Sequence, residues 1–289
     1  MNLTQANFST KARTWVLLAG LTALFVGVGW AIGGAALWFF VFFSVFMNLA
    51  AYFWSDKFAI RASRAQEVSP QEAPDLHHMV EELAQLYSVP KPRVYLIPSE
   101  QPNAFATGRN PEHSAVAVTQ GLLQHLPRDQ VRGVLAHEFS HIKNRDILVS
   151  SIAAMIAGAI SAIGNIFFFM GIFGDDDDNP LGAIGSLLLI IVAPIAASLL
   201  QLAVSRQREF LADATAARML GTGEPLAQAL ETLERGRDAI PMNVNPATET
   251  LYIVNPFNGK GMTALFSTHP PLADRVARLR EYDRNRGIV

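Results

Sequence analysis

Two histidines and a glutamate within five residues form the group in this sequence that is best suited to chemistry. They are His137, Glu138 and His141, in the segment His-Glu-Phe-Ser-His. At about 100° per residue of helix, the two imidazoles point the same way, beside the expected buried face. Two neutral imidazoles on one helix face can bind Zn²⁺, and the glutamate between them can deprotonate an attacking water without binding the metal. The segment predicts a zinc site that activates water, whereas the alternative, polar side chains at a domain surface, leaves Glu138 unexplained.

A catalytic zinc needs a third protein ligand and one open position. The chain has no cysteine, so this ligand must come from His, Asp or Glu. Glu209 and Asp213 lie one turn apart on one face of a predicted helix that begins at Ser205, and Ala212 and Ala216 beside them would let another helix approach closely. We predict one zinc per chain, with Glu209 as the third ligand and Asp213 as acceptor for the remaining N–H of a ligand histidine. The alternative is a pair of carboxylates on a solvated helix.

The elements that must position these residues are those of a membrane protein. Hydrophobic residues make up 50% of the chain and charged residues only 17%. The net charge of -2 gives no support to a nucleic-acid partner. Residues 14–55 contain no charged side chain, and this stretch is about twice as long as the roughly 20 residues that one membrane helix needs. Gly33 and Gly34 near its middle predict the turn of a transmembrane hairpin.

A second pair of uncharged runs, 147–174 and 181–205, predicts another hairpin, with four aspartates in the loop between the runs. Lysine and arginine flank the outer ends of both hairpins, so the positive-inside rule places these ends, both termini and the zinc site on the cytoplasmic side. An antiparallel hairpin would also bring His141, just before it, and Glu209, just after it, to the same membrane face. The expected organisation is a cytoplasmic tail (1–13), a hairpin (14–55), the first part of a catalytic domain (56–146), a second hairpin (147–204) and the second part of that domain (205–289).

The sequence of the cytoplasmic part predicts mostly helices and a small sheet. Pro74 opens an amphipathic helical pattern, and Pro127 precedes the helix of the histidine motif. Short apolar segments separated by turn residues predict strands at 93–97, 103–108 and 114–119. The expected fold class is therefore an α+β membrane protein, with four transmembrane helices and a zincin-like cytoplasmic domain.

The two motifs above, together with residues 103–108 and 269–275, resemble the HtpX-type membrane zinc endopeptidases, with the CAAX prenyl proteases as more distant relatives. The resemblance covers nearly the whole chain, including the order of the four spans. It implies a multi-pass protein of the bacterial cytoplasmic membrane that contacts the bilayer and cleaves unfolded polypeptides. In particular, it implies misfolded or damaged membrane proteins as substrates, in quality control and the stress response.

The same resemblance implies roles for two further regions. In such proteases the strand that matches residues 103–108 lies along the active-site cleft as an edge, with which an extended substrate can pair; the alternative is an ordinary strand beside a turn. His269 and Arg275 match family positions near the zinc, where they would stabilise an oxyanion or tie the last helix to the carboxylates, although His269 could also simply begin a helix. The residues expected to bind substrate are Asn103, Ala104, Phe105 and Ala106.

Two other functions are compatible with parts of this pattern. A CAAX-type protease that acts on prenylated tails shares the zinc motif, but such relatives enclose their site within more membrane spans than the four expected here. A transporter or scaffold with a structural metal predicts ionisable side chains inside the spans, and the four uncharged runs contain none. The sequence therefore favours a zinc endopeptidase with Glu138 as its general base.

Overall fold

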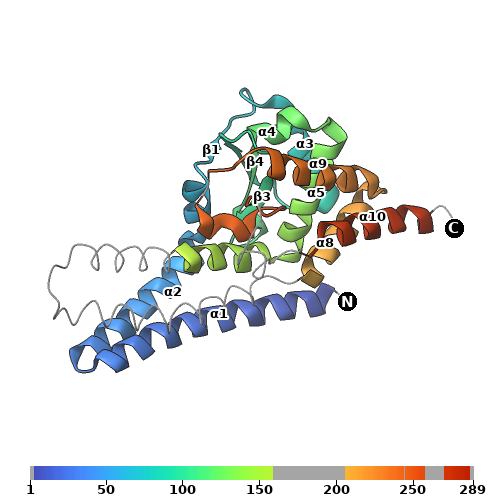
Figure 1. Ribbon diagram of the computed structural model, residues 1–289. Coiled ribbons are helices and arrows are strands. Elements are labelled where there is room, and N and C mark those ends of the chain that lie inside the picture. Colours follow the sequence, from blue (N-terminus) through green and yellow to red (C-terminus); the bar gives the residue numbers. More distant parts are fainter. Residues whose placement is uncertain (1–2, 159–205, 244, 258–269, 287–289) are drawn as a thin grey trace.

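The computed structural model describes residues 3–158, 206–243, 245–257 and 270–286, and it joins a helical hairpin to a globular part (Figure 1). Most of the predicted second hairpin, from residue 159 on, lies outside the described residues, as does His269. The helices are α1 (Leu3–Ile32), α2 (Ala35–Ala62), α3 (Pro74–Tyr87), α4 (Gln120–His125), α5 (Arg128–Asn144), Ile147–Gly158, α8 (Arg206–Leu220), α9 (Glu224–Ala239) and α10 (Leu272–Arg286), with the 3₁₀ helices η1 (Pro111–His113) and η2 (Pro246–Leu251). The strands are β1 (Gln66–Glu67), β2 (Arg93–Ile97), β3 (Ala104–Gly108) and β4 (Ser114–Thr119).

The four strands form one sheet in the order β1-β2-β4-β3, so β3 lies at an edge. β2 and β4 are parallel, whereas β3 pairs with β4 in the antiparallel sense, with Phe105 opposite Ala117. The predictions for β2 and β4 are confirmed. β3 begins one residue later than predicted, because the N–H of Asn103 donates to the side-chain hydroxyl of Thr119 (2.8 Å) instead of to the ladder.

Alternate side chains of the sheet enter two different hydrophobic clusters. Val94, Val116 and Ala106 face α3 and α5. Tyr95 and Phe105 belong to the other cluster, which includes side chains from α2, from the helix Ile147–Gly158 and from the end of η2. The sheet is therefore buried on both faces, which explains the almost continuously apolar sequences of β3 and β4.

α5 occupies the middle of the globular part, in contact with α3, α8, α9 and β3 (Figure 1). Gly133 allows the close approach of α9, because a Cβ at this position would lie 2.9 Å from the backbone nitrogen of Leu226. α5 ends at Asn144, and the left-handed backbone of the next residue, Arg145 (φ 59°, ψ 30°), closes the helix. The chain then enters the apolar helix Ile147–Gly158 after one further residue.

The hairpin of α1 and α2 turns at Gly33 and Gly34, both at positive φ (81° and 57°), which confirms the predicted turn. Both helices extend beyond the predicted membrane span, since α1 begins at Leu3 and α2 continues to Ala62. Among the described helices, α2 alone is long and apolar enough to cross a membrane. The apolar segments Thr14–Gly27 and Ile147–Gly158 are shorter.

The close contact at Gly133 gives a test of this packing. We expect Gly133→Ala to lower the free energy of unfolding by about 1–3 kcal/mol, because the added methyl group must push apart two helix backbones. The matched control is Gly27→Ala in α1, where an added Cβ meets nothing within 4 Å. Thermal unfolding in detergent, followed by circular dichroism, compares the two variants. An equal or smaller loss of stability in Gly133→Ala would contradict the described packing.

Candidate active site and metal centre

Three side chains from two helices converge at the centre of the globular part. His137 and His141 come from α5, and Glu209 comes from the first turn of α8. The Nε2 atoms of the two histidines lie 3.0 Å apart, and the Glu209 carboxylate oxygens lie 3.7 Å from Nε2 of His137 and 3.6 Å from Nε2 of His141. The side chains of His141 and Glu209 keep 17% and 10% of their surface exposed, so the group is reachable from solvent. The structure thus brings together the three residues predicted to hold a metal.

The spacing of these atoms fits a tetrahedral zinc. Ligand atoms that surround Zn²⁺ at about 2.0–2.2 Å lie roughly 3.3–3.6 Å from one another in that geometry. The two Nε2 atoms lie 3.0 Å apart, and each has a different oxygen of the Glu209 carboxylate at 3.6 or 3.7 Å, so these distances lie close to this range. Two imidazole nitrogens and one carboxylate are also a ligand set typical of catalytic zinc. The residues present therefore fit the ion.

A buried ion pair holds the first of these histidines. Oδ1 of Asp213 lies 2.9 Å from Nδ1 of His137. Arg275 of α10 is fully buried and donates two hydrogen bonds of 2.8 Å to the same carboxylate. Burial alone would raise the pKa of Asp213, but Arg275 and His137 outweigh it and lower that pKa to about 2. The resemblance implied that Arg275 would either stabilise an oxyanion or tie the last helix to the carboxylates. In the described structure, Arg275 connects α10 to the carboxylate of Asp213.

The second histidine is held by an aspartate that sequence reasoning missed. Both oxygens of Asp146 lie 3.1 Å from Nδ1 of His141, and Asp146 is buried. Its place follows from the end of α5, where the left-handed turn at Arg145 carries the next residue back toward the last helical turn. There the N–H of Asp146 donates to the carbonyl of His141 (3.2 Å). An acidic residue directly before the uncharged run that begins at residue 147, five positions after a candidate ligand, was the available signal.

The charges around the histidines favour a cation between them. Burial lowers the pKa of His137, so this imidazole stays neutral, which is the form that binds metal. Burial acts in the same direction on His141, but the carboxylates of Asp146, Glu209 and Glu138 outweigh it and raise the pKa of His141 to about 10. These carboxylates stabilise a positive charge at this point, and a bound Zn²⁺ would supply it while leaving both imidazoles neutral.

Glu138 is buried beside the three predicted ligands and contacts the edge strand. The N–H of Ala106 in β3 donates to its Oε2 (2.7 Å). Burial raises the pKa of Glu138 to about 8, and the nearby charge of Glu209 adds to this effect. A raised pKa makes the ionised form of Glu138 a stronger base than an exposed glutamate.

The free edge of β3 is partly covered by the chain itself. The carbonyl of Ala104 accepts from the N–H of Ile253 (3.0 Å), and the side-chain amide of Asn103 donates to the carbonyl of Val254 (2.7 Å). The ring of Phe105 packs edge-to-face on that of Tyr252 (5.2 Å between centroids). Of the four residues expected to bind substrate, Asn103, Ala104 and Phe105 thus contact this internal segment. Ala106 contacts Glu138 instead.

Comparison of the sequence with known proteins identifies its family. Residues 70–283 match Peptidase family M48, a stretch that contains the sheet strands β2 to β4 and the helices α5 and α8. The chain belongs to peptidase family M48. Two relatives, each named Protease HtpX homolog, extend the match beyond the M48 region. One, from Pelotomaculum thermopropionicum, is 52% identical over 273 residues, covering 92% of this chain and 97% of the relative. The other, from Persephonella marina, is 51% identical over 284 residues, covering 96% and 99%.

Membership of family M48 confirms the predicted resemblance and makes the chain a metallopeptidase, not a transporter or scaffold. The fold is also similar to that in a crystal structure of Ste24p from S. mikatae, with a TM-score of 0.50 and 21% identity. That similarity covers 94% of this chain and 64% of the Ste24p chain. It shows a shared fold.

The ion pair behind His137 gives the next test. We expect Arg275→Met to lower the free energy of unfolding by about 3–5 kcal/mol, because it leaves the Asp213 carboxylate buried without its partner. The matched control is Arg280→Met on the same helix, since Arg280 pairs with Glu224 and Glu231 at the surface and should matter much less. Thermal unfolding in detergent measures both. Similar losses in the two variants would contradict a structural role for the buried pair.

Proposed function

We propose that the chain is a zinc-dependent endopeptidase of the membrane, with His137, His141 and Glu209 as the zinc ligands and Glu138 as the general base. One observation carries this proposal. The three ligand atoms lie within 4.8 Å of one another, and the buried carboxyl group of Glu138 lies on the adjacent turn of the same helix. When bound there, zinc supplies Lewis-acid polarisation of the scissile carbonyl and makes a water more acidic.

Glu138 performs the proton transfers of the reaction. It accepts a proton from the water while the water oxygen attacks the carbonyl carbon of the scissile peptide bond, and it then gives this proton to the leaving amine as the C–N bond breaks. The hydrogen bond from the N–H of Ala106 to Oε2 fixes the orientation of the carboxyl group and leaves Oε1 for the proton. The burial that raises the pKa of Glu138 makes it a stronger base than an exposed glutamate.

Two carboxylates orient the ligand histidines. Asp213 accepts the Nδ1 proton of His137, and Asp146 accepts that of His141, so each imidazole presents a neutral Nε2 to the metal. Arg275 keeps Asp213 ionised and in place, and we assign it this positioning role. A role for His269 in stabilising the oxyanion remains part of the proposal by resemblance alone.

The substrate is expected to lie extended along the edge of β3 near Ala106. This is where the edge strand meets Glu138, beyond the part that Ile253 already covers at Ala104. Main-chain pairing with a strand edge recognises any extended polypeptide, whatever its side chains. This supports unfolded polypeptides, and in particular misfolded or damaged membrane proteins, as the substrates.

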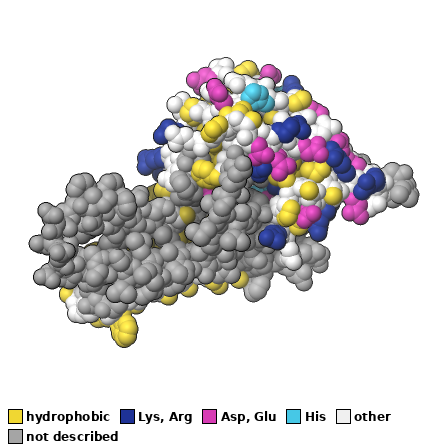
Figure 2. All heavy atoms as spheres, in the orientation of Figure 1, with side chains coloured by type: hydrophobic (Ala, Val, Ile, Leu, Met, Phe, Trp, Pro, Cys, Tyr) yellow, Lys and Arg dark blue, Asp and Glu magenta, His cyan; other side chains and the backbone are white. Residues whose placement is uncertain are grey.

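The membrane setting is supported by the exposed hydrophobic side chains. All but two of the large hydrophobic side chains that are exposed among the described residues lie on α1 and α2, including Trp30 (76%) and Phe42 (71%). In Figure 2, charged side chains gather on the globular part and hydrophobic ones fringe the hairpin. We propose four spans, in the hairpins 14–55 and 147–204, with the termini, the tail (1–13) and both parts of the catalytic domain (56–146, 205–289) on the cytoplasmic side of a bacterial cytoplasmic membrane.

Glu138→Gln tests the catalytic base. This variant should bind zinc as the wild type does but cleave an unfolded test protein at least about 10²-fold more slowly, because only the proton acceptor is removed. The chain is purified in detergent, stripped with chelator and given zinc, and metal content and proteolysis are measured together. Glu112→Gln, at an exposed position, controls for the loss of a carboxylate. Comparable cleavage by Glu138→Gln would refute the mechanism.

Asp146→Asn tests the support behind His141. We expect zinc affinity to fall by about 10–100-fold, because an amide is a weaker acceptor for the Nδ1 proton and the imidazole becomes a poorer ligand. Competition with a chromophoric chelator measures the affinity. Asp129→Asn, an exposed aspartate in the first turn of the same helix, is the control. Unchanged affinity in Asp146→Asn would remove Asp146 from the metal centre.

A further inference from the structure

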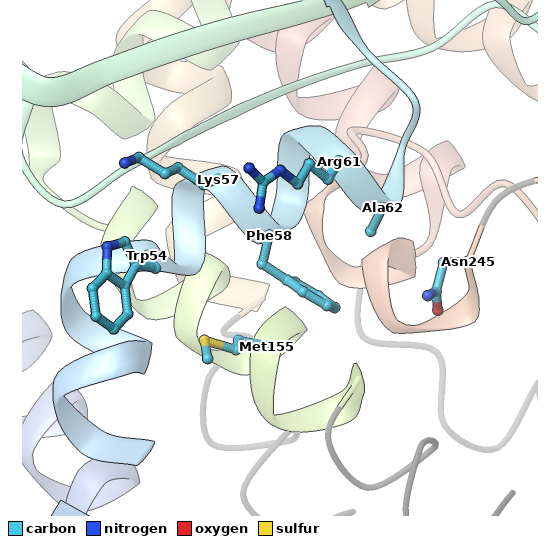
Figure 3. A pocket seen from close by; sticks show the side chains of 7 residues that line it. All are labelled: Trp54, Lys57, Phe58, Arg61, Ala62, Met155 and Asn245. Atoms are coloured by element: carbon cyan, nitrogen blue, oxygen red, sulfur yellow. The ribbon is translucent and has the colours of Figure 1, made fainter. Parts of the chain in front are cut away.

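A cavity of about 600 Å³ opens beside the C-terminal part of α2, away from the metal centre. Figure 3 shows Trp54, Lys57, Phe58 and Arg61 following one another along this helix, with Met155 facing them from the helix Ile147–Gly158. Ala62 and Asn245 are the other described residues that line it. The cavity therefore combines two cations with an aromatic and aliphatic wall, and its volume is in the range of small-molecule sites.

In the part of the chain that the structure describes, the two cations of this cavity have no acidic counterpart there. Lys57 and Arg61 are exposed, and among the described residues no aspartate or glutamate lines the cavity or forms an ion pair with either side chain. Arg93, near the same end of α2, differs in that it pairs with Asp56 (3.3 Å). The positive charge at the cavity is thus available to an anion.

The position of the cavity along α2 indicates which kind of anion can reach it. The exposed aromatic side chains of Tyr52, Phe53 and Trp54 end the apolar part of α2, and Lys57 and Arg61 follow within two turns. Aromatic rings followed by cations are typical of the boundary between the hydrocarbon core and the headgroups. On the membrane placement given under the proposed function, the cavity lies at the level of the lipid phosphates.

We infer that this cavity binds an anionic phospholipid. Lys57 and Arg61 would contact the negatively charged headgroup, and Trp54, Phe58 and Met155 would contact the upper part of the acyl chains. A lipid bound there would touch both α2 and the helix that begins directly after Asp146. It would therefore stabilise the position of the helix Ile147–Gly158, which runs from the metal centre toward the bilayer. This inference rests on the membrane placement, but not on the catalytic mechanism.

The experiment uses quenching of Trp54 by brominated lipids. The chain has four tryptophans, and changing Trp15, Trp30 and Trp38 to phenylalanine leaves Trp54 as the only emitter. The full-length protein is placed in phosphatidylcholine nanodiscs that contain a small fraction of either brominated phosphatidylglycerol or brominated phosphatidylcholine. We expect stronger quenching by the anionic lipid at equal mole fraction.

Charge variants in this single-tryptophan background distinguish a defined site from a general electrostatic attraction of anionic lipids by the basic residues at the C-terminal end of α2. Lys57→Gln and Arg61→Gln should each lower the preference for the anionic lipid at least about fivefold. Arg64→Gln removes the same charge just beyond α2, from a residue that does not line the cavity, and should change the preference less than about twofold.

Four results would overturn the inference. Equal quenching by the two lipids would show that the cavity has no preference for the anionic headgroup. An effect of Arg64→Gln as large as that of Lys57→Gln or Arg61→Gln would show only general electrostatic attraction by the basic residues at this end of α2. Relief of quenching by excess inorganic phosphate at matched ionic strength would assign the cavity to a soluble anion. Absence of quenching by either lipid would refute the membrane placement of α2 as well, whereas zinc-dependent cleavage could still be observed.

Discussion

The buried contact between Arg275 and Asp213 is the interaction on which the rest of the site depends. Neither charge can be left alone in the interior without a large free-energy cost, so the two side chains must meet whenever the chain is folded. Their pairing holds α10 against α8, and the same carboxylate holds His137 on α5. The guanidinium also donates to the carbonyl of Ile253 (3.1 Å), next to the edge strand. One buried cation thus links four parts of the chain that are far apart in sequence.

Around this pair, the site is assembled from rigid elements. α5 carries two of the proposed metal ligands and the proposed base within two successive turns, and a sheet buried on both faces keeps β3 in place beside them. The bond from Ala106 to Glu138 joins the proposed substrate edge to the proposed base with a single backbone N–H. Small errors in the register of β3 would therefore affect the orientation of Glu138 directly, which fits the need of a catalytic group for a preorganised setting.

The metal centre is also close to the proposed membrane surface along the chain. Asp146 contacts His141, and the next residue begins the apolar helix Ile147–Gly158. The left-handed turn at Arg145 makes this sharp transition possible. A lipid in the cavity between this helix and α2 would contact the helix near its other end, at Met155. The bilayer and the proposed zinc site would then be connected through this one short helix.

Local patterns in the sequence determined much of this protein. The spacing of His137, Glu138 and His141, the turn at Gly33 and the strands β2 and β4 all follow from periodicity and backbone preference, which act between neighbours. The spacing of Glu209 and Asp213 on one helix face predicted the third ligand, and the family resemblance added Arg275 to the same neighbourhood. Only the tertiary structure decided how Asp146 reaches back to His141, whether Arg275 binds a carboxylate, and that Asn103 holds Val254. Periodicity predicts which face of a helix or strand is buried, but the partner of that face is set by the packing of distant segments, such as those of Asn103 and Val254, 151 residues apart.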